Sequence, residues 1–345
     1  MVEWKKLGEV CSFDRGRTIT AKDAVEGDVP VIAGGQTPSY YHNESNRTGE
    51  NITIAGSGAY AGFVSYWNQP IFVSDAFTVK PSERLKHKYL FYWLKMNQQK
   101  IFDTQKGAGV PHVHGKDIAG FQIPLPSLSE QARIVGILDT FTTSIENLKE
   151  QIAQRRKQYE YYRDELLDLE GKEGVEMKTL GEIAKVLRGK RLTKNQLDDN
   201  ATYPVFHGGL EPLGKYGQYN REANTVMVIN VGASAGTVGY SDCKFWSSDG
   251  CFCISHSELL NNKYLFYFLE TKTHYLQSQV RHAGIPTLDN PVVEKVSIPL
   301  LSLSEQSRMV SILDTFEASI ANLEAQLKER EKQYEYYRNK LLTFE

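Results

Sequence analysis

Cationic side chains beside glycine occur twice in this chain, and they are the residues best suited to binding phosphate. Arginine and lysine neutralise phosphate oxygens, while glycine lets the backbone approach at the same point. The pattern therefore predicts two loops that contact a nucleic-acid backbone. The cations are Arg15, Arg17, Arg188, Lys190 and Arg191.

Polar and aromatic residues of the kind that read base edges follow in two stretches, 36–54 and 210–229, which share little sequence. Their amide, imidazole, guanidinium and phenol groups offer donors and acceptors to bases, so we expect them to select a DNA sequence. Solvated polar loops are the alternative for any one residue. The candidates are Gln36, Tyr40, Tyr41, His42, Asn46, Tyr216, Gln218, Tyr219, Asn220 and Arg221, and the predicted DNA contacts also include Ser57, Tyr60, His112, His114, His207 and Ser234.

The sequence contains no pattern typical of a catalytic site. His112 and His114 have no carboxylate or cysteine at metal-ligand spacing, so a polar loop contact is favoured over a metal site. Gly56, Gly58 and Gly62 have the spacing GxGxxxG with no amphipathic helix after them, which favours a tight hairpin turn over a dinucleotide fingerprint. No P-loop, GxSxG or HExxH occurs. We expect neither enzymatic activity nor a cofactor or metal in this chain.

Composition bounds the class of protein. Apolar residues make up 41% and charged residues 24% of the 345, which is ordinary for a globular chain. A net charge of −2 confines any nucleic-acid surface to local patches. No apolar run approaches the ~20 residues of a membrane span. The start lacks a signal-peptide core and the four cysteines lack CxxC spacing, so a cytoplasmic location with reduced thiols is expected.

Nearly every feature of the sequence recurs about 175 residues later. EKQYEYYRNKLLTFE (331–345) repeats RKQYEYYRDELLDLE (156–170). The duplication predicts two copies of one module that keep a scaffold and vary what lies between its fixed points. The runs at 51–67 and 225–241 have β-branched residues around a Gly/Ala/Ser turn and predict hairpins. The predicted segments are domain 1–122, helix 123–170, linker 171–176, domain 177–297 and helix 298–345.

Each copy ends in a heptad pattern that predicts a helix of roughly 40 residues, about 60 Å long. Positions a and d run from Gln131 and Ile134 onward in the first copy and from Gln306 onward in the second. Apolar or aromatic residues fill most of them, and Arg155 and Arg330 interrupt the stripe at equivalent places. Such a narrow stripe favours antiparallel pairing of the two helices over packing of each on its own module.

Serines placed three residues before a glutamate mark the predicted start of each helix. Ser127 and Glu130 form one such capping box, and Ser302 and Glu305 form the other. Tyr161 and Tyr336 lie outside the a/d stripe, and exposed tyrosines of this kind are common in binding hot spots. We expect each to contact one partner subunit, and packing against the neighbouring domain is the alternative.

The chain resembles the specificity subunits of type I restriction–modification systems over essentially its whole length. The resemblance rests on IPLPSLSEQARIVGILD (123–139) and RRKQYEYYRDELL (155–167), with their partners at 298–314 and 330–342. It implies an α+β fold, in which two tandem-repeat mixed α/β target-recognition domains are joined by two long antiparallel coiled-coil helices with pseudo-twofold symmetry.

The same resemblance implies the division of labour between subunits. This subunit would read two halves of a gapped sequence in double-stranded DNA without doing chemistry. Two modification subunits would carry S-adenosylmethionine and methylate adenine, and restriction subunits using Mg and ATP would translocate and cleave. The residues that read DNA differ between members of the family and do not carry over. A non-catalytic coiled-coil scaffold with protein- or glycan-binding modules remains the alternative from the residues themselves.

Overall fold

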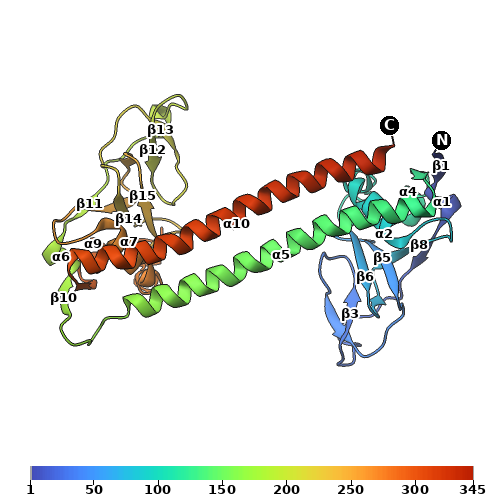
Figure 1. The fold of residues 1–345 in the computed structure, drawn as a ribbon, viewed down its shortest axis with the longest axis horizontal. Coiled ribbons are helices and arrows are strands. Elements are labelled where there is room, and N and C mark those ends of the chain that lie inside the picture. The colour runs from blue at the N-terminus through green and yellow to red at the C-terminus, as the bar shows by residue number, and fades with distance from the viewer. Residues whose placement is uncertain (1, 345) are drawn as a thin grey trace. The chain divides into compact units, whose positions relative to one another are not determined.

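The computed structural model describes residues 2–344, which form two compact units. Unit 1 comprises Met1–Glu150 with Ala325–Glu345, and unit 2 comprises Gln151–Glu324. Each unit contains one globular module and one end of each long helix (Figure 1). The units therefore cross the segment boundaries predicted from sequence, because the last turns of the chain pack in the first unit.

Unit 1 is built on a four-stranded antiparallel sheet in the order β2-β8-β5-β6, with α2 packed against it. A second sheet has the order β4-β3-β7, in which β3 and β7 run parallel, and β1 pairs with β9. The elements are β1 (Glu3–Lys6), α1 (Leu7–Val10), β2 (Cys11–Arg15), β3 (Val29–Ile32), β4 (Tyr40–His42), β5 (Glu50–Ala55), β6 (Val64–Asn68), β7 (Phe72–Val73), β8 (Ala76–Pro81), α2 (His87–Met96), α3 (Gln98–Phe102), α4 (Gly115–Ile118) and β9 (Gln122–Leu125).

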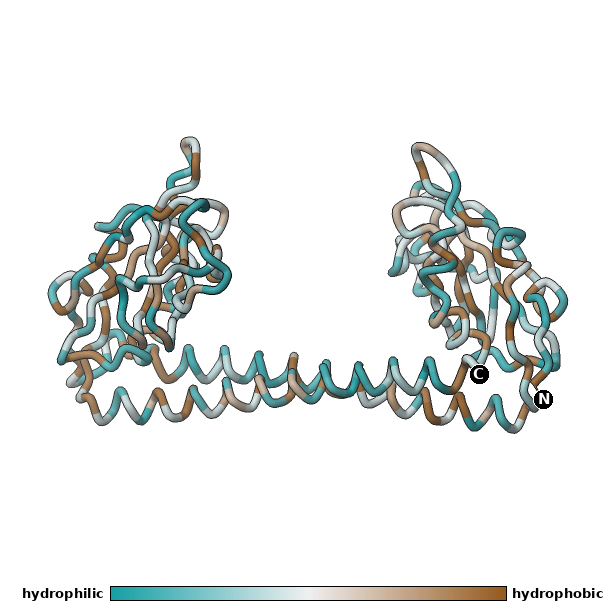
Figure 2. Tube along the Cα trace, turned by 90° about the horizontal axis from the view of Figure 1, so that it is seen from above, coloured by the Kyte–Doolittle hydropathy of each residue, from teal (hydrophilic) through white to brown (hydrophobic). Residues whose placement is uncertain are grey.

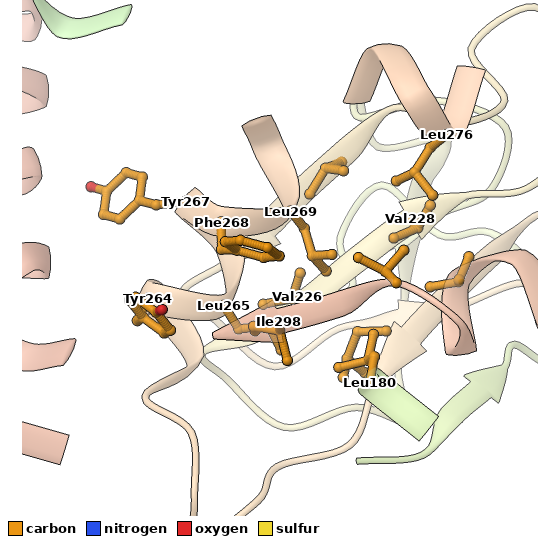
Figure 3. Packing of buried hydrophobic residues seen from close by; sticks show 14 of the residues in the cluster. Leu180, Val226, Val228, Tyr264, Leu265, Tyr267, Phe268, Leu269, Leu276 and Ile298 are labelled. Carbon is orange, nitrogen blue, oxygen red and sulfur yellow. The ribbon is translucent and has the colours of Figure 1, made fainter. Parts of the chain in front are cut away.

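Unit 2 repeats this arrangement with a β11-β17-β14-β15 sheet, a β13-β12-β16 sheet and a β10-β18 pair. Its core gathers buried side chains from α6, α7, β14 and β18, including Leu180, Val226, Tyr264 and Ile298 (Figure 3). The elements are β10 (Glu176–Thr179), α6 (Leu180–Ile183), β11 (Val186–Arg188), η1 (Lys194–Gln196), β12 (Tyr203–Phe206), β13 (Gly214–Tyr216), β14 (Thr225–Ile229), β15 (Val238–Ser241), β16 (Trp246–Ser247), β17 (Cys251–Ile254), α7 (Asn262–Thr271), α8 (Thr273–Ser278), α9 (Asn290–Glu294) and β18 (Ser297–Leu300).

Both predicted hairpins are confirmed. Strand β5 pairs with β6 and β14 pairs with β15, each antiparallel around a glycine-containing turn. Gly62 and Gly236 close these turns with φ of +92° and +88°, a left-handed conformation that favours glycine. At Gly236 a Cβ would also lie 2.8 Å from the backbone of Gln277. The glycines therefore serve the turns, as expected, rather than a dinucleotide.

The long helices α5 (Leu128–Leu167) and α10 (Leu303–Thr343) begin directly after the serines that mark their predicted starts. The segments predicted at 123–170 and 298–345 also include most of strands β9 and β18, which pair with β1 and β10. The predicted serines cap the helices: Ser127 Oγ accepts a hydrogen bond from the Glu130 N–H (3.2 Å), and Ser302 Oγ accepts one from the Glu305 N–H (3.3 Å).

The ends of the helices belong to the cores of the modules. In unit 1, Ile134 and Leu138 of α5 and Leu342 of α10 are fully buried in one cluster with the sheet and α2. In unit 2, Met309 and Leu313 of α10 occupy the equivalent places. The residues towards the middle of both helices are mostly hydrophilic, whereas apolar residues recur nearer the ends (Figure 2). Packing on a module and pairing of helices thus each account for part of the stripe.

Within each unit the two helix segments run antiparallel, as predicted. In unit 1, Phe141 of α5 stacks on Tyr337 of α10, and Lys149 lies 3.4 Å from Glu331. In unit 2, Tyr162 of α5 stacks on Phe316 of α10, the same contact with the roles of the helices exchanged. In unit 2 the ion pair of Arg156 with Glu324 is the second contact. In both units the later residue of α5 meets the earlier residue of α10, so the segments run in opposite directions.

The two arginines that interrupt the heptads lie over aromatic rings of the opposite helix. The Arg330 guanidinium is 5.7 Å from the Phe141 ring centroid in unit 1. The Arg155 guanidinium is 5.9 Å from the Phe316 ring centroid in unit 2. Each half-buried arginine therefore gains a cation–π contact where an aliphatic side chain would sit in an ordinary coiled coil.

Polar contacts fix each module to the helix that follows it. In unit 1, Lys88 Nζ and the Tyr92 hydroxyl both donate to Asp139 of α5, at 2.8 and 2.5 Å. In unit 2, Lys263 Nζ and the Tyr267 hydroxyl donate to Asp314 of α10, both at 2.6 Å. Burial, followed by the hydrogen bond to the carboxylate, raises the pKa of both tyrosines above the ordinary value. These tyrosines consequently stay protonated and serve as donors.

Candidate nucleic-acid interface

Two of the predicted DNA contacts, Asn46 and Asn220, hydrogen-bond to the backbone of a neighbouring strand in their own module. The Asn46 side chain donates to the Val73 carbonyl (2.9 Å) and accepts from the Val73 N–H (2.7 Å). Asn220 makes the same two bonds to Ser247, at 2.9 and 2.7 Å. Each amide thus uses its oxygen and one N–H to hold a strand, which favours a scaffold role for both residues over reading bases. Their recurrence in both copies reflects the scaffold.

Arg221, another predicted contact, braces the strand that carries Arg188. Its guanidinium donates to the carbonyls of Asn220 (2.7 Å) and Arg188 (2.9 Å). Arg47, which the sequence reasoning missed, does the same for Arg15 in unit 1, at 3.2 Å. The recurrence of Asn-Arg at 46–47 and 220–221 was the available signal, and it indicates positioning of the cationic strand ends.

Three aromatic candidates, His42, Tyr40 and Tyr216, also make contacts within their own modules. His42 is only 5% exposed, accepts at Nδ1 from the Val25 N–H (3.0 Å) and packs edge-on against Phe72. The Tyr40 hydroxyl donates to the Ile19 carbonyl at 2.6 Å. The Tyr216 ring meets Trp246 edge-on. The structure thus removes His42 from the set that can reach a base and leaves Tyr40 and Tyr216 half-buried as structural contacts.

The glycines between the predicted cations serve packing. A Cβ on Gly16 would overlap the carbonyl oxygens of Val73 and Ser74, and one on Gly189 would overlap that of Ser248. The cations themselves are exposed at the ends of β2 and β11. Glycine therefore lets the loop pass close to the neighbouring strand, which corrects its predicted role beside phosphate, while the cations remain exposed.

The remaining candidates lie at or near the surface. Arg17 is 4.0 Å from Glu44 and lies over the Phe72 ring, and Lys244 donates to the Tyr219 hydroxyl at 2.9 Å. His207 Nδ1 accepts from the Gly250 N–H (3.2 Å). Ser57 contacts Asp75 and Ser234 lies in the second hairpin turn. The exposed ones are Arg15, Arg17, Gln36, Tyr41, Tyr60, His112, His114, Arg188, Lys190, Arg191, Gln218 and Tyr219.

Some of these exposed residues meet in a polar cleft of unit 1, which we call cleft 1. It lies where the end of β2 faces the loop between α3 and α4. Its lining includes Phe13, Arg15, Gly56, Asp75, Phe77, His112, His114 and Lys116. Four of the eight are basic or imidazole side chains, against one carboxylate. Such a cleft suits a partner that carries negative charge and hydrogen-bonding edges.

A salt bridge holds the loop that forms the outer wall of cleft 1. Lys106 pairs with Asp117, and the backbones of Lys106 and His112 exchange hydrogen bonds of 2.8 and 3.0 Å. The Lys106 hydrogen bond, against a smaller effect of burial, holds the pKa of Asp117 below its ordinary value, and the His114 N–H assists. The imidazoles of His112 and His114 are parallel with centroids 6.3 Å apart, so one wall presents two stacked rings.

Unit 2 has a cleft at the equivalent place, which we call cleft 2. Arg188 stands opposite Phe252 in the sheet as Arg15 stands opposite Phe77. Thr287 bridges Val231 as His112 bridges Ser57. Cleft 2 is lined by Val186, Arg188, Asn230, Phe252, Thr287, Leu288, Asp289, Asn290 and Pro291. The two clefts share their position and arginine but differ in most other polar groups.

A third cleft in unit 2, the side cleft, brings together Arg188, Arg191 and His207 from the predicted set. Arg188, Asn230 and Thr287 line both this cleft and cleft 2. Among the described residues no cluster of three His, Cys, Asp or Glu side chains could hold a metal ion, and no helix is long and apolar enough to cross a membrane.

The fold and the clefts define a duplicated binding protein, in which two copies of one module present equivalent but chemically different sites. The family model described as "Type I restriction modification DNA specificity domain" matches residues 1–155 and 172–332. The chain therefore belongs to this family. It is the DNA specificity subunit of a type I restriction–modification system and, as the family implies, not an enzyme.

Similar proteins agree with this assignment. A putative type I restriction enzyme specificity subunit of Haemophilus influenzae is 28% identical, over 99% of this chain and 96% of the relative. The EcoR124I/EcoR124II specificity subunit of Escherichia coli is also 28% identical, over 99% of this chain and 94% of its own.

The same fold occurs in solved structures. The type I S subunit of M. genitalium has a TM-score of 0.77 at 19% identity and covers 100% of this chain and 97% of its own. A chain of a type I R-M complex has a TM-score of 0.59 at 20% identity and covers 99% of this chain and 97% of its own. Together with the family match, these likenesses confirm the predicted fold class.

Proposed function

We propose that this subunit reads a bipartite, gapped DNA target, with one half-site bound by unit 1 and the other by unit 2. The observation that carries the proposal is the pair of clefts at equivalent positions. Each cleft is lined by an arginine at the end of a strand, Arg15 of β2 or Arg188 of β11. A guanidinium in this place can bind a phosphate or the edge of a guanine. The other polar groups differ, so two clefts of one architecture would select two different sequences.

We further propose that the chain directs reactions carried out by partners. Two modification subunits, with S-adenosylmethionine, would methylate adenine in the target. Restriction subunits, with Mg and ATP, would cleave DNA that lacks the methyl groups. The support is the resemblance to specificity subunits over nearly the full length of the relatives.

The tyrosine-rich turns of α5 and α10 are the proposed contacts for the modification subunits. Tyr161 and Tyr336 are 64% and 59% exposed, and each packs edge-on against the next tyrosine, Tyr162 or Tyr337. The Tyr336 ring also lies under Lys340. The two exposed rings stand in equivalent places, one in each unit, so one chain would engage two copies of a partner. Exposure of this kind favours docking over packing against the module.

Methylation mapping tests the proposed function. The chain is co-expressed with its modification subunit in a host that lacks adenine methylation, and methylated adenines are located across the genome. The expected result is one asymmetric motif of two defined halves around undefined bases. A contiguous motif, or methylation that does not depend on the specificity subunit, would overturn the proposal.

A further inference from the structure

Exposed apolar residues lie at equivalent places in two loops, Val110 between α3 and α4 and Ile285 between α8 and α9. Val110 is 54% exposed and Ile285 is 71% exposed. A single exposed apolar residue is ordinary on a protein surface. Here the feature recurs in both copies of the module, within the matching runs Gly-Val-Pro (109–111) and Gly-Ile-Pro (284–286). The recurrence indicates that both modules use an apolar loop tip.

The loop of unit 1 is fixed at its base. The backbones of Lys106 and His112 exchange hydrogen bonds of 2.8 and 3.0 Å, and the Pro111 carbonyl accepts from the Gly58 N–H (3.0 Å). Proline also restricts the residue before it, Val110, to extended conformations. The tip of unit 1 is therefore held in place before any ligand binds.

The loop of unit 2 is fixed by the same backbone contacts. Arg281 and Thr287 exchange hydrogen bonds of 2.9 and 3.0 Å, and the Pro286 carbonyl accepts from the Gly232 N–H (2.9 Å). Little conformational freedom remains to be lost when a ligand covers either tip, which favours tight contact.

The glycine before each tip borders open space. A Cβ on Gly109 or Gly284 would meet no atom within 4 Å. Gly284 has a φ of +94°, which favours glycine, whereas the φ of Gly109 is not positive. Neither conformation nor packing thus requires glycine at 109, in contrast to Gly16 and Gly189, which lie against a neighbouring strand. Glycine at this place lets a ligand outside the module approach the backbone closely.

DNA is the ligand that the position of the tips favours. His112, two residues after Val110, lines cleft 1, and Thr287, two residues after Ile285, lines cleft 2. Two residues span at most about 7 Å, so a duplex bound at either cleft would lie next to the tip. Each cleft also contains an arginine suited to phosphate, as described above.

The tips are alike in the two units, whereas the side chains that follow them differ. Thr287 stands in unit 2 where unit 1 has His112, and Asp289 stands where unit 1 has His114. Polar side chains that read bases are expected to differ where the half-sites differ. A β-branched apolar side chain forms no hydrogen bond and can pack on any base pair. The tips therefore suit a contact that is common to both half-sites.

We propose that Val110 and Ile285 are wedges, one for each half-site, which insert into the base stack beside the clefts and partly separate two base pairs. Apolar side chains insert in this way in several classes of DNA-binding protein, where they unstack and kink the duplex. The inference rests on the proposed function, because it requires DNA at both clefts.

The assembled methyltransferase and a duplex that contains its mapped target test the inference. Val110→Ala and Ile285→Ala, singly and together, shorten the tips. Val110→Ile and Ile285→Val exchange the two natural side chains and should preserve the wedge. Leu128→Ala combined with Leu303→Ala is the matched control, because these leucines are 46% and 51% exposed at equivalent helix starts and line none of the three clefts.

Fluorescence of 2-aminopurine, placed in turn at positions in and beside each half-site, reports unstacking. The adenine that becomes methylated is left unlabelled, because enzymes that modify a base extrude it from the stack. The wild-type complex should raise the fluorescence at one step beside each half-site. Val110→Ala should abolish the rise at one half-site and Ile285→Ala at the other, while the exchange variants and the leucine control keep both.

The double alanine variant should also bind the duplex about 5–20-fold more weakly, as expected when a few buried methyl groups are lost. The dependence of affinity on salt should stay the same, because no phosphate contact is removed. Absence of the wild-type rise in fluorescence, or a rise that persists in the double variant, overturns the inference. Weaker assembly of the double variant with the modification subunits in the absence of DNA also overturns it and assigns the tips to a protein partner. A wild-type enzyme without a gapped motif would instead overturn the proposed function.

Discussion

Leu342, near the end of the chain, is buried in the core of unit 1, and replacing it with alanine measures how much that contact stabilises the unit. The side chain is 0% exposed and packs in the cluster that contains Ile52, Leu90 and Ile134. Leu342→Ala should cost about 2–5 kcal/mol, as for other fully buried leucines. In a unit of this size each kcal/mol lowers the melting temperature by roughly 2–4 °C. The free energy of unfolding is read from urea transitions.

Hydrogen exchange locates the effect. Amides of β5, β8 and α2 in unit 1 should lose protection, although they lie more than 200 residues before the substitution, while the strands of unit 2 keep theirs. Leu167→Ala is the matched control, because Leu167 is 3% exposed in the equivalent place of the unit 2 core. It should shift the loss to β14, β17 and α7. Unchanged protection in unit 1 with Leu342→Ala, or loss in both units, would refute this account of the core.

Three further predictions concern the helices and the loop of cleft 1. Adding one heptad to α5 and to α10 at equivalent points adds about 10 Å to each at 1.5 Å per residue, or about three base pairs at ~3.4 Å each. Methylation mapping should show a longer gap and the same half-site bases, and altered bases would mean that the helices are more than spacers. Changing Tyr161 and Tyr336 together to Ser should weaken co-purification with the modification subunit while helix content by circular dichroism stays constant, and full 2:1 assembly of this variant would place the docking surface elsewhere. Lys106→Ala should raise the pKa of Asp117 towards the ordinary value of an aspartate, because it removes the strongest interaction that lowers it. A lowered folded-state pKa stabilises the loop above the ordinary pKa and ceases to do so as the pH falls through the folded value, so an acid titration by carboxyl NMR should show the variant carboxylate titrating at higher pH, and an identical titration contradicts the pairing.

The repeated scaffold could be predicted from sequence because its physics is local. Heptad spacing, serine caps and β-branched runs around small turn residues each dictate an element within a few residues. Leu167 and Leu342 were missed, since they lie outside the a/d positions and are buried only because the last helical turn meets a module. The spacing of apolar residues within a helix does not show which of its turns will pack against a module that is distant in sequence.

The candidate site was predictable only in part, for a different reason. Asn46, Asn220 and Asn230 have the same amide, the first two in polar stretches and Asn230 after the apolar run 226–229. Two of them clamp a neighbouring strand and the third has an unused oxygen. That difference depends on which backbone groups lie opposite, which tertiary pairing decides. The arginines at 15 and 188 were predictable because a cation beside glycine recurs in both copies, and the structure places each at an exposed strand end.

The closure of unit 1 by Leu342 has a consequence for the order of events on the ribosome. The module of unit 1 emerges early, but the helical turns that complete its core are among the last to be translated. At about 5–20 residues per second, the intervening chain takes roughly 10–40 s to make. During that time the nascent module exposes an apolar patch that only its own late segment covers. A ribosome that stalls before that segment would thus release a first module with an open core, a natural substrate for chaperones and proteases.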